Sequence, residues 1–591
     1  MQIQCRSARN QSRLFPFSCG RSSLASSFGK ERQADVSLPA RGTRPSRLAL
    51  DPALGYASPP MRLYRAFATV GGLTMVSRVF GFLRDILIAA TLGSGAVADA
   101  FFVAFRFPNL FRRLFGEGAF NAAFVPLFAK RLEGEGREAA RAFAEEAMAG
   151  LLFVILGITI IAQLFMPFLM YGLAPGFRAN PDKFDLAVLL TRITMPYLVC
   201  MSLVALLSGV LNSLGKFVES SAVSIVLNLT MMAATLLALA MGLRSDPLAG
   251  VVQAWGVFAA GLLQLWLLLD GARRHGLWLR LRWPRMSEGV RRLIKLGIPG
   301  VIAGGVTQIN IVIGTVVASL QDGAVSHLYY ADRVYELPLA IVGIAIGVVL
   351  LPDVARHLRA GNHAAVMDSQ NRSLEFAMLL TVPAAVALAV VPTEIVRGLF
   401  ERGAFTAADT PATAYALAIF ALGLPSFVLI KVFQPAYFAR EDTATPMRYA
   451  VLSLTVNTIG SVALFFLFRR MGLMPHLGIA VATTLGGWLN AGLLWATLSK
   501  RGEFAADARL ERALPRIGLA SLVMGAALWL VAGQLEGWFA ASQGVLVRMT
   551  ALGALVASGL AVYAAAAMGL GAIDLRQLRG LIRRSRPADP I

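Results

Sequence analysis

The stretch SRVFGFLRDILIAA, residues 77–90, combines the apolar composition of a membrane-spanning helix with three charged side chains. Arg78, Arg84 and Asp85 would each lie inside the bilayer, where an isolated charge costs about 2.5–3.5 kcal/mol on insertion scales. Arg78 and Asp85 are two helical turns apart, so they share a face and could nearly pair. Arg84 lies about 120° round the helix from Arg78, so a cavity common to both arginines requires a bend, for which Gly81 is the natural place.

Two further apolar segments carry charges of both signs: Asp99, Arg106, Arg112 and Arg113 in one, and Asp332, Arg333 and Glu336 in the other. Structural explanations exist for several of them. The arginines of the first segment could snorkel to the membrane interface, the two acids of the second could neutralise Arg333, and Asp85 could simply pair with Arg84. Pro108 interrupts the helical phase, so spacing does not choose between Arg112 and Arg113. For Arg78 and Arg84, deep in their segment, a water-filled cavity is the better interpretation.

The basic residues that we assign to this cavity are arginines, without a lysine. A guanidinium group binds a phosphate or diphosphate through two parallel hydrogen bonds, and an excess of cations argues against a cationic drug as substrate. The sequence has no Walker A motif, deaminase signature, HExxH motif or nucleophile elbow. The three cysteines and five histidines lack ligand spacing, so we expect neither a metal site nor a cofactor.

The composition is that of a membrane protein. Of 591 residues, 57% are hydrophobic and 15% charged, with a mean hydropathy of +0.64. The net charge of +21 would suggest nucleic acid on a soluble chain. Here basic residues between spans follow the positive-inside rule and meet anionic lipid headgroups, so we expect membrane lipids as partners and no nucleic acid.

Apolar runs long enough to cross a bilayer recur fourteen times along the chain. They lie near 66–92, 97–131, 139–172, 184–214, 218–242, 247–271, 296–320, 325–357, 370–400, 410–438, 446–469, 476–499, 512–534 and 543–570. The connections alternate between Lys/Arg-rich and Lys/Arg-poor. The sequence therefore predicts an all-α polytopic membrane protein of fourteen transmembrane helices, with both termini in the cytoplasm.

An internal repeat divides the spans. Segments GAVADAFFVAFRFPNLF (95–111) and GAVSHLYYADRVYELPLA (323–340) share their GAV start, an aromatic pair and a proline, and Asn228 corresponds to Asn457, all at offsets of about 226–230 residues. The repeat unit holds six spans, an even number, so we expect two six-helix lobes related by a pseudo-two-fold axis along the membrane normal. The second copy of the first span is apolar around Val306 and Val312, which favours a functional role for Arg78, Arg84 and Asp85.

The predicted organisation has six parts: an N-terminal extension (1–60), an N-lobe (61–275), a basic cytoplasmic linker (276–295), a C-lobe (296–500), an added helix pair (501–572) and a basic cytoplasmic tail (573–591). The extension is rich in Arg, Ser and Pro and has no apolar core, which excludes a secretory signal peptide. Its composition fits an organellar transit peptide or DNA translated upstream of the true start. We favour the misplaced start, with Met61 as the natural first residue.

Several stretches resemble the MurJ (MviN) family of bacterial lipid II flippases, in the MOP exporter superfamily: SRVFGFLRD, DAFFVAFRFPNLFRRLFGEGAFNAAFVP, APGF, YYADRVYELP and GVVLLP. The likeness runs from about Met61 to the tail. It implies a central cavity between two lobes and a lipid-tail groove on the last two helices. The family's cavity arginines map onto Arg78, Arg84, Arg112 and Arg333, and Asp85 and Asp99 match its acidic positions, with Glu336 as a further supporting acid.

The resemblance implies a transporter, not an enzyme, in the bacterial cytoplasmic (inner) membrane. Its substrate would be undecaprenyl-diphosphate carrying the disaccharide-pentapeptide of peptidoglycan, moved from the inner to the outer leaflet by alternating access during cell-wall biosynthesis. Some family members bind Na⁺ in the second lobe, but the matching span here offers only Gln308 and Asn310. Coupling to Na⁺, to H⁺ or to the membrane potential stays open, as do contacts with other cell-wall synthesis proteins.

Three other functions compete with this interpretation. An exporter of the same architecture could move a different lipid-linked oligosaccharide, or drugs. A membrane-embedded glycosyltransferase would need an acid or a metal-binding carboxylate pair facing water, and no loop supplies an obvious one. A scaffold for the wall-synthesis machinery would need no cavity arginines.

Overall fold

The computed structural model describes the backbone at residues 59–112, 119–540 and 542–572. These residues form helices joined by short connections, and the one β-type contact among them is an isolated bridge between Arg402 and Phe405. The predicted extension (1–60) lies outside the described residues except for its last two positions, and the predicted tail (573–591) lies wholly outside them.

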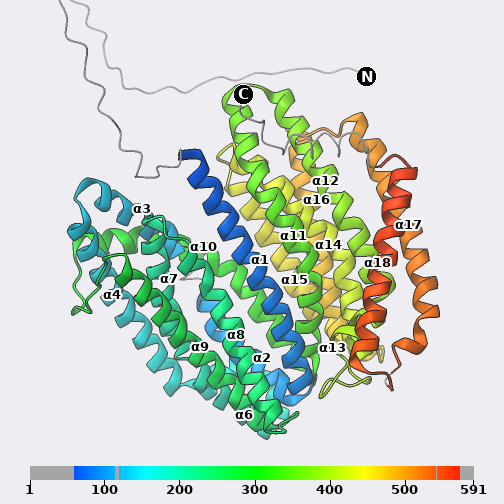
Figure 1. Cartoon of the computed structure of the whole chain (residues 1–591), viewed down its shortest axis with the longest axis horizontal. Coiled ribbons are helices and arrows are strands. Elements are labelled where there is room, and N and C mark those ends of the chain that lie inside the picture. The colour runs from blue at the N-terminus through cyan, green and yellow to red at the C-terminus, as the bar shows by residue number, and fades with distance from the viewer. Residues whose placement is uncertain (1–58, 113–118, 541, 573–591) are drawn as a thin grey trace, which may run out of the picture. The chain divides into compact units, whose positions relative to one another are not determined.

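Two groups of helices pack mainly among themselves (Figure 1). The N-terminal bundle contains α2 (Ala96–Arg112), α3 (Ala119–Gly134), α4 (Arg137–Leu164), α5 (Met166–Leu173), the 3₁₀ helix η2 (Pro175–Ala179), α6 (Pro181–Thr194), α7 (Tyr197–Ser213), α8 (Val218–Ala240) and α9 (Pro247–Arg274). The C-terminal bundle contains α11 (Ala324–Arg359), α12 (His363–Val390), α13 (Pro392–Phe400), α14 (Thr410–Phe438), α15 (Ala444–Arg470), α16 (His476–Lys500), α17 (Ala508–Gln534), the 3₁₀ helix η3 (Glu536–Trp538) and α18 (Val545–Gly569).

Two helices connect the bundles. Helix α10 (Glu288–Ala318) packs against α3, α4 and α5 of the N-terminal bundle and against α15 and α16 of the C-terminal bundle. Helix α1 (Pro59–Leu92) bonds to α8 through Arg84 and to α11 through Asp85. The limits of the predicted lobes stay a prediction, and α10, which opens the predicted C-lobe, belongs by its contacts to both bundles.

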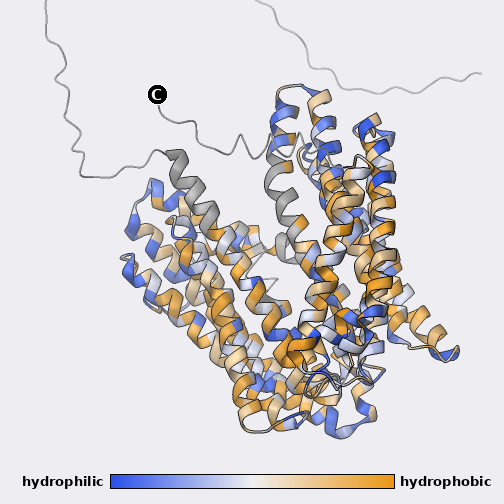
Figure 2. Cartoon of the chain, turned by 45° about the vertical axis from the view of Figure 1, so that its right-hand side comes forward, coloured by the Kyte–Doolittle hydropathy of each residue, from blue (hydrophilic) through white to orange (hydrophobic). Residues whose placement is uncertain are grey.

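Ten helices in the described part of the chain are long and apolar enough to cross a membrane. Figure 2 shows hydrophobic residues along the middle of the helices and hydrophilic ones at their ends. Large apolar side chains face outward, such as Leu164, Phe168, Trp266 and Trp529, each more than 60% exposed. An apolar surface of this extent is stable only against lipid, so the chain is a multi-pass membrane protein.

Each of the fourteen predicted spans corresponds to one helix or to two helices in succession. The predicted span 97–131 begins in α2 and ends in α3, and residues 113–118 between them lie outside the described part. The span 370–400 divides into α12 and α13 because Pro392 lacks the amide hydrogen that would continue the helix. Whether all fourteen cross the bilayer stays a prediction, since ten meet the criterion of length and composition.

The two bundles meet through polar contacts at one end, which we call the closed end and define by residues 90–99, 183, 322–330 and 403–409. Lys183 Nζ lies 2.7 Å from Asp99 Oδ2 and 2.8 Å from Asp322 Oδ1. The amide of Ala404 donates to the carbonyl of Ala90 at 2.8 Å, and the hydroxyl of Tyr330 donates to the carbonyl of Gly93 at 2.7 Å. These bonds join α1, α2 and α6 to the C-terminal bundle.

Asp99 is the centre of this end. Its carboxylate accepts hydrogen bonds from the amides of Gly323 and Ser326, at 2.8 and 2.9 Å, and from the Ser326 hydroxyl at 2.8 Å. These groups belong to the N-terminus of α11, whose unpaired amides and dipole favour a negative charge. Asp99 has no exposed surface, so its charge is balanced entirely by Lys183 and the start of α11.

Replacing Asp99 with Asn should destabilise the protein more than replacing Asp322 with Asn. Asp99 is fully buried, whereas the side chain of Asp322 is 86% exposed. Breaking a buried pair costs about 3–5 kcal/mol because it leaves an uncompensated charge, and an exposed pair contributes little. The midpoint of thermal unfolding in detergent measures the difference. Equal losses in Asp99→Asn and Asp322→Asn would show that Asp99 does not hold the closed end together.

Candidate functional site

Arg84 and Asp85 form a buried ion pair in the middle of α1. The Nε and Nη2 atoms of Arg84 lie 3.0 and 2.8 Å from Asp85 Oδ1. The Nη1 atom of Arg84 donates to Asn228 Oδ1 at 2.9 Å, and Tyr329 donates its hydroxyl to Asp85 Oδ1 at 3.1 Å. The side chains of Arg84 and Asp85 are only 8% and 2% exposed, so three helices share one desolvated charge pair.

A second ion pair lies next to it on α11. Arg333 Nη1 is 2.8 Å from Glu336 Oε2, and Arg333 Nη2 is 3.5 Å from Asp332 Oδ2. The guanidinium group also lies over the ring of Tyr329, 5.0 Å from its centroid. The Nε atom of Arg333 is buried and has no hydrogen-bond partner in the described part of the chain. Tyr329 therefore contacts both pairs, through its hydroxyl on one side and its ring on the other.

Both ion pairs line a cavity of about 720 Å³ between α1, α2, α7, α8, α10 and α11. Its charged lining residues in the described part of the chain are four arginines and three acids: Arg78, Arg84, Arg106, Arg333, Asp85, Asp332 and Glu336. The lining thus carries a net charge of +1. This is a smaller excess of cations than the sequence suggests, because three carboxylates line the cavity beside the four arginines.

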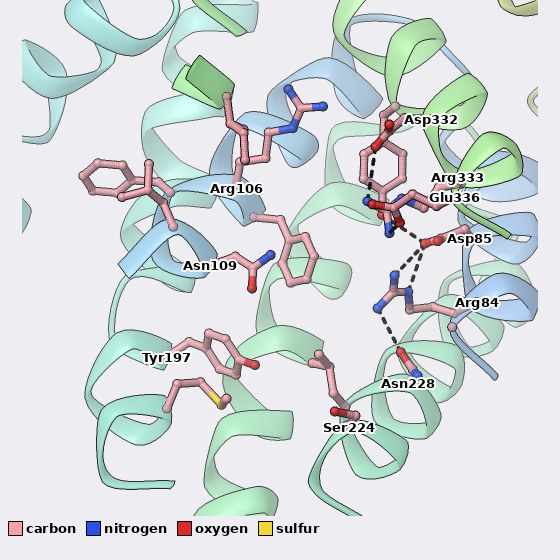
Figure 3. A pocket seen from close by; sticks show the side chains of 18 of the residues that line it. Arg84, Asp85, Arg106, Asn109, Tyr197, Ser224, Asn228, Asp332, Arg333 and Glu336 are labelled. Carbon is pink, nitrogen blue, oxygen red and sulfur yellow. Dashed lines mark hydrogen bonds and ion pairs between the residues drawn. The ribbon is translucent and has the colours of Figure 1, made fainter. Parts of the chain in front are cut away.

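The two ion pairs lie together on one side of the cavity. Figure 3 shows Arg84, Asp85, Arg333 and Glu336 gathered where α1 and α11 approach each other, with Arg106, Asn109 and Tyr197 across the cavity from them. Arg78 lines the cavity and makes no hydrogen bond or ion pair with the described residues. One free guanidinium group and two that are held by carboxylates can bind an anion by exchange of partners.

The predicted site residues divide into three groups. Arg78, Arg84 and Arg333 line the cavity, together with the acids Asp85 and Glu336. Arg112 is the last residue of α2, and its side chain lies outside the described part of the chain. Asp99 does not line the cavity: it lies at the closed end, because the start of α11 and Lys183 offer it partners there.

The structure decides between two partners that the sequence left open for Asp85. Spacing allowed Arg78 and adjacency allowed Arg84, and the structure pairs Asp85 with Arg84. Asn228 accepts a hydrogen bond from the Nη1 atom of the same guanidinium group. Arg78 and Arg84 both line the cavity while α1 runs as one unbroken helix, and Gly81 between them lies against the side chain of Asn228.

Sequence reasoning missed four residues of this arrangement. Asn228 was visible only as a marker of the repeat. For Arg106, the sequence could not distinguish a place in the cavity from one at the membrane interface, whereas the structure shows it lining the cavity and donating to Thr315 Oγ1 at 2.7 Å. Lys431 of α14 lies within electrostatic range of Arg78 and Glu336, and Lys183 pairs with Asp99. Nothing in the local sequence of either lysine indicates its partners, since each lies far from them along the chain.

The described residues include no group of three or more His, Cys, Asp or Glu side chains that could hold a metal ion. Gln308, one of the two polar residues expected on α10, lines the cavity, and the side chain of Asn310 lies outside the described part.

Comparison with known proteins identifies the family. The family model described as lipid II flippase MurJ matches residues 88–547. A probable lipid II flippase MurJ from Rhizobium tropici is 46% identical over 530 residues, which cover 89% of this chain and 98% of that protein. The chain belongs to the MurJ family. The lipid II flippase MurJ of Burkholderia cenocepacia is 35% identical over 75% of this chain and 85% of its own length.

Solved structures agree with the MurJ assignment. A structure described as lipid II flippase MurJ in an inward closed conformation matches with a TM-score of 0.68 and 25% identity, covering 84% of this chain and 97% of its own. An inward-facing multidrug resistance MATE family transporter of the MOP superfamily matches with a TM-score of 0.58 at 13% identity, over 74% of this chain and 98% of its own. The second match shows a shared fold alone.

Asn228 can be tested as the residue that orients Arg84. Asn228→Leu should weaken binding of inorganic pyrophosphate about tenfold, because one hydrogen bond to a charged group is lost and the guanidinium group is no longer fixed. Asn457→Leu is the matched control: Asn457 is the buried counterpart of Asn228 in the repeat and does not line the cavity. Isothermal titration of the purified protein measures both. Equal effects of the two substitutions would contradict the orienting role.

Proposed function

We propose that this protein flips lipid II, the undecaprenyl-diphosphate carrier of the peptidoglycan disaccharide-pentapeptide, from the inner to the outer leaflet of the bacterial cytoplasmic membrane. This proposal depends chiefly on the arginine-lined cavity between two bundles, which are joined at one end by polar contacts and by the packing of Phe102 against Tyr329. Membership of the MurJ family supports the substrate, and the absence of a catalytic motif from the sequence is consistent with transport.

The orientation follows from the distribution of basic residues. The closed end carries connections poor in Lys and Arg, such as 93–96 and 321–323, and the other ends of the same helices carry basic ones, such as 273–295. By the positive-inside rule the closed end faces the periplasm, and both chain termini lie in the cytoplasm. The cavity in this state would therefore receive its substrate from the cytoplasmic side.

The ion pairs suggest how binding leads to the conformational change. Asp85 and Glu336 keep Arg84 and Arg333 in place when no anion is bound. A diphosphate that replaces these carboxylates would bind α1 and α11 at once, with Arg78 free to add a third guanidinium group. The acids released in this exchange would need new partners, which favours a different arrangement of the two bundles. Alternating access would then carry the headgroup to the opposite face.

The polyprenyl tail would stay in lipid along α17 and α18. These helices pack against each other and against α12 and α13, and their outer surface exposes Leu519, Leu522, Trp529 and Leu560. A tail outside the cavity leaves only the polar headgroup to cross between the bundles, which keeps the hydrophobic part of the substrate in its preferred solvent throughout.

Arg84→Ala should abolish flipping while the protein still inserts into the membrane. The test is complementation of a bacterial strain depleted of its own lipid II flippase, with expression checked by immunoblot. Arg470→Ala, at the exposed end of α15, is the control and should complement fully. Growth supported by Arg84→Ala would favour a scaffolding role, and failure of the unmodified chain at normal expression would favour another lipid-linked substrate.

The membrane potential would drive the return of the protein, after substrate release, to the state in which its empty cavity faces the cytoplasm. The described lining carries a net charge of +1, and one charge crossing a 100 mV potential gains about 2.3 kcal/mol. Flipping of fluorescent lipid II in proteoliposomes should therefore slow several-fold when an ionophore collapses an inside-negative potential. A rate independent of potential but dependent on a Na⁺ or H⁺ gradient would show that an ion drives the return instead.

A further inference from the structure

A second cavity, of about 300 Å³, lies in the N-terminal bundle beside the central one. It is formed by α1, α3, α7 and α8. Its polar lining consists of side chains without charge: Asn121, Ser208, Asn212, Ser220, Ser221 and Ser224. We call it the serine pocket. Val70, Met201, Val204 and Phe217 provide apolar surface between these groups, and no Arg, Lys, Asp or Glu is among the described residues that line it.

The serine pocket adjoins the central cavity. Met201, Val223 and Ser224 line both, and Figure 3 shows Ser224 beside Asn228, below Arg84. The serine pocket extends from there toward the ends of α7 and α8 at Asn212 and Phe217, away from the closed end. A bound molecule can therefore occupy the side with the two ion pairs and the serine pocket at the same time.

Three of the four serine hydroxyl groups of this pocket are available to a ligand, while that of Ser220 bonds within the protein. Ser and Thr in apolar helices usually donate back to the carbonyl four residues earlier, as Ser202 and Ser213 of α7 do. The hydroxyl groups of Ser208, Ser221 and Ser224 make no such bond, nor any other hydrogen bond with the described residues. Asn212 accepts from Ser220 Oγ at 2.7 Å through its side-chain oxygen, which leaves its amide nitrogen free to donate.

Uncharged donors and acceptors alternating with apolar surface are suited to a carbohydrate. A sugar ring offers hydroxyl and acetamido groups to the serines and asparagines, and its C–H face to Met201 and Phe217. A diphosphate gains nothing here, because the lining has no cation to balance its charge. The volume lies at the lower end of the range for ligand pockets, enough for one ring but not for the whole headgroup.

We propose that the serine pocket binds an amino-sugar ring of the substrate headgroup while the diphosphate lies at the arginines of the central cavity. This inference rests on the proposed function and extends it to a second contact. Recognition of the sugar would let the protein distinguish a lipid carrier that bears sugar from the same diphosphate lipid without it. The arginines cannot make this distinction, because both lipids carry the diphosphate that they contact.

The test compares the affinity of the full chain in lipid nanodiscs for three probes. They are a short-chain polyprenyl diphosphate, the same lipid bearing the disaccharide, and the same lipid bearing disaccharide and pentapeptide. The variant is Ser208→Ala combined with Ser221→Ala, which removes two hydroxyl groups that line only the serine pocket. Ser202→Ala combined with Ser213→Ala is the control, since it removes two hydroxyl groups from the same region that bond to their own helix.

We expect the serine-pocket variant to bind both sugar-bearing lipids about tenfold more weakly, from two lost hydrogen bonds, and the sugar-free lipid unchanged. The control should bind all three probes as the unmodified protein does. Equal affinity of variant and unmodified protein for the disaccharide lipid would overturn the proposal, and so would a loss confined to the pentapeptide probe. Arg84→Ala in the same assay tests the proposed function separately, because unchanged affinity for the sugar-free lipid would contradict the diphosphate site and not the sugar contact.

Discussion

A guanidinium group inside a membrane protein must be paired or hydrated, and Arg84 meets this constraint with both an ion partner and a cavity. Its carboxylate partner is its neighbour in the chain, so the pair alone needs no particular fold. The fold is needed to bring up the next partners. Asn228 of α8 bonds to Arg84 and Tyr329 of α11 bonds to Asp85, each from a different bundle. The position of α1 between the bundles, and the placement of the ion pairs on one side of the cavity, follow from these contacts.

The same contacts can be exchanged. A carboxylate that neutralises an arginine at a water-filled surface lowers the cost of the empty state, and a more highly charged anion can displace it. The closed end is built differently, because Asp99 is enclosed by Lys183 and the amides of α11 with no exposed surface. The molecule thus combines ion pairs that line the central cavity with a fully enclosed one that joins the bundles, and the uncharged serine pocket adds a contact that charge alone would not supply.

Much of this arrangement could be predicted from the sequence. Apolar run length located the helices, since each predicted span corresponds to one helix or two. The cost of buried charge singled out Arg78 and Arg84, and the family resemblance added Arg333; all three line the cavity. The partners of these charged side chains could not be predicted. The periodicity of an α-helix shows which residues share a face of that helix, but it says nothing about which residues of neighbouring helices they contact. Asp99 illustrates what the sequence could not predict. It is an aspartate in an apolar segment, as Asp85 is, yet its partners Lys183 and Gly323 are 84 residues or more away along the chain and lie at the closed end.

Substrate binding should replace the carboxylates at Arg84 and Arg333 by a diphosphate. The most direct measurement is a cryo-electron microscopy structure of the chain with a short-chain polyprenyl diphosphate bound. We expect phosphate oxygens within hydrogen-bond distance of both guanidinium groups, with the bonds from Arg84 to Asp85 and from Arg333 to Glu336 broken or lengthened. A diphosphate bound elsewhere, with both ion pairs intact, would contradict this expectation.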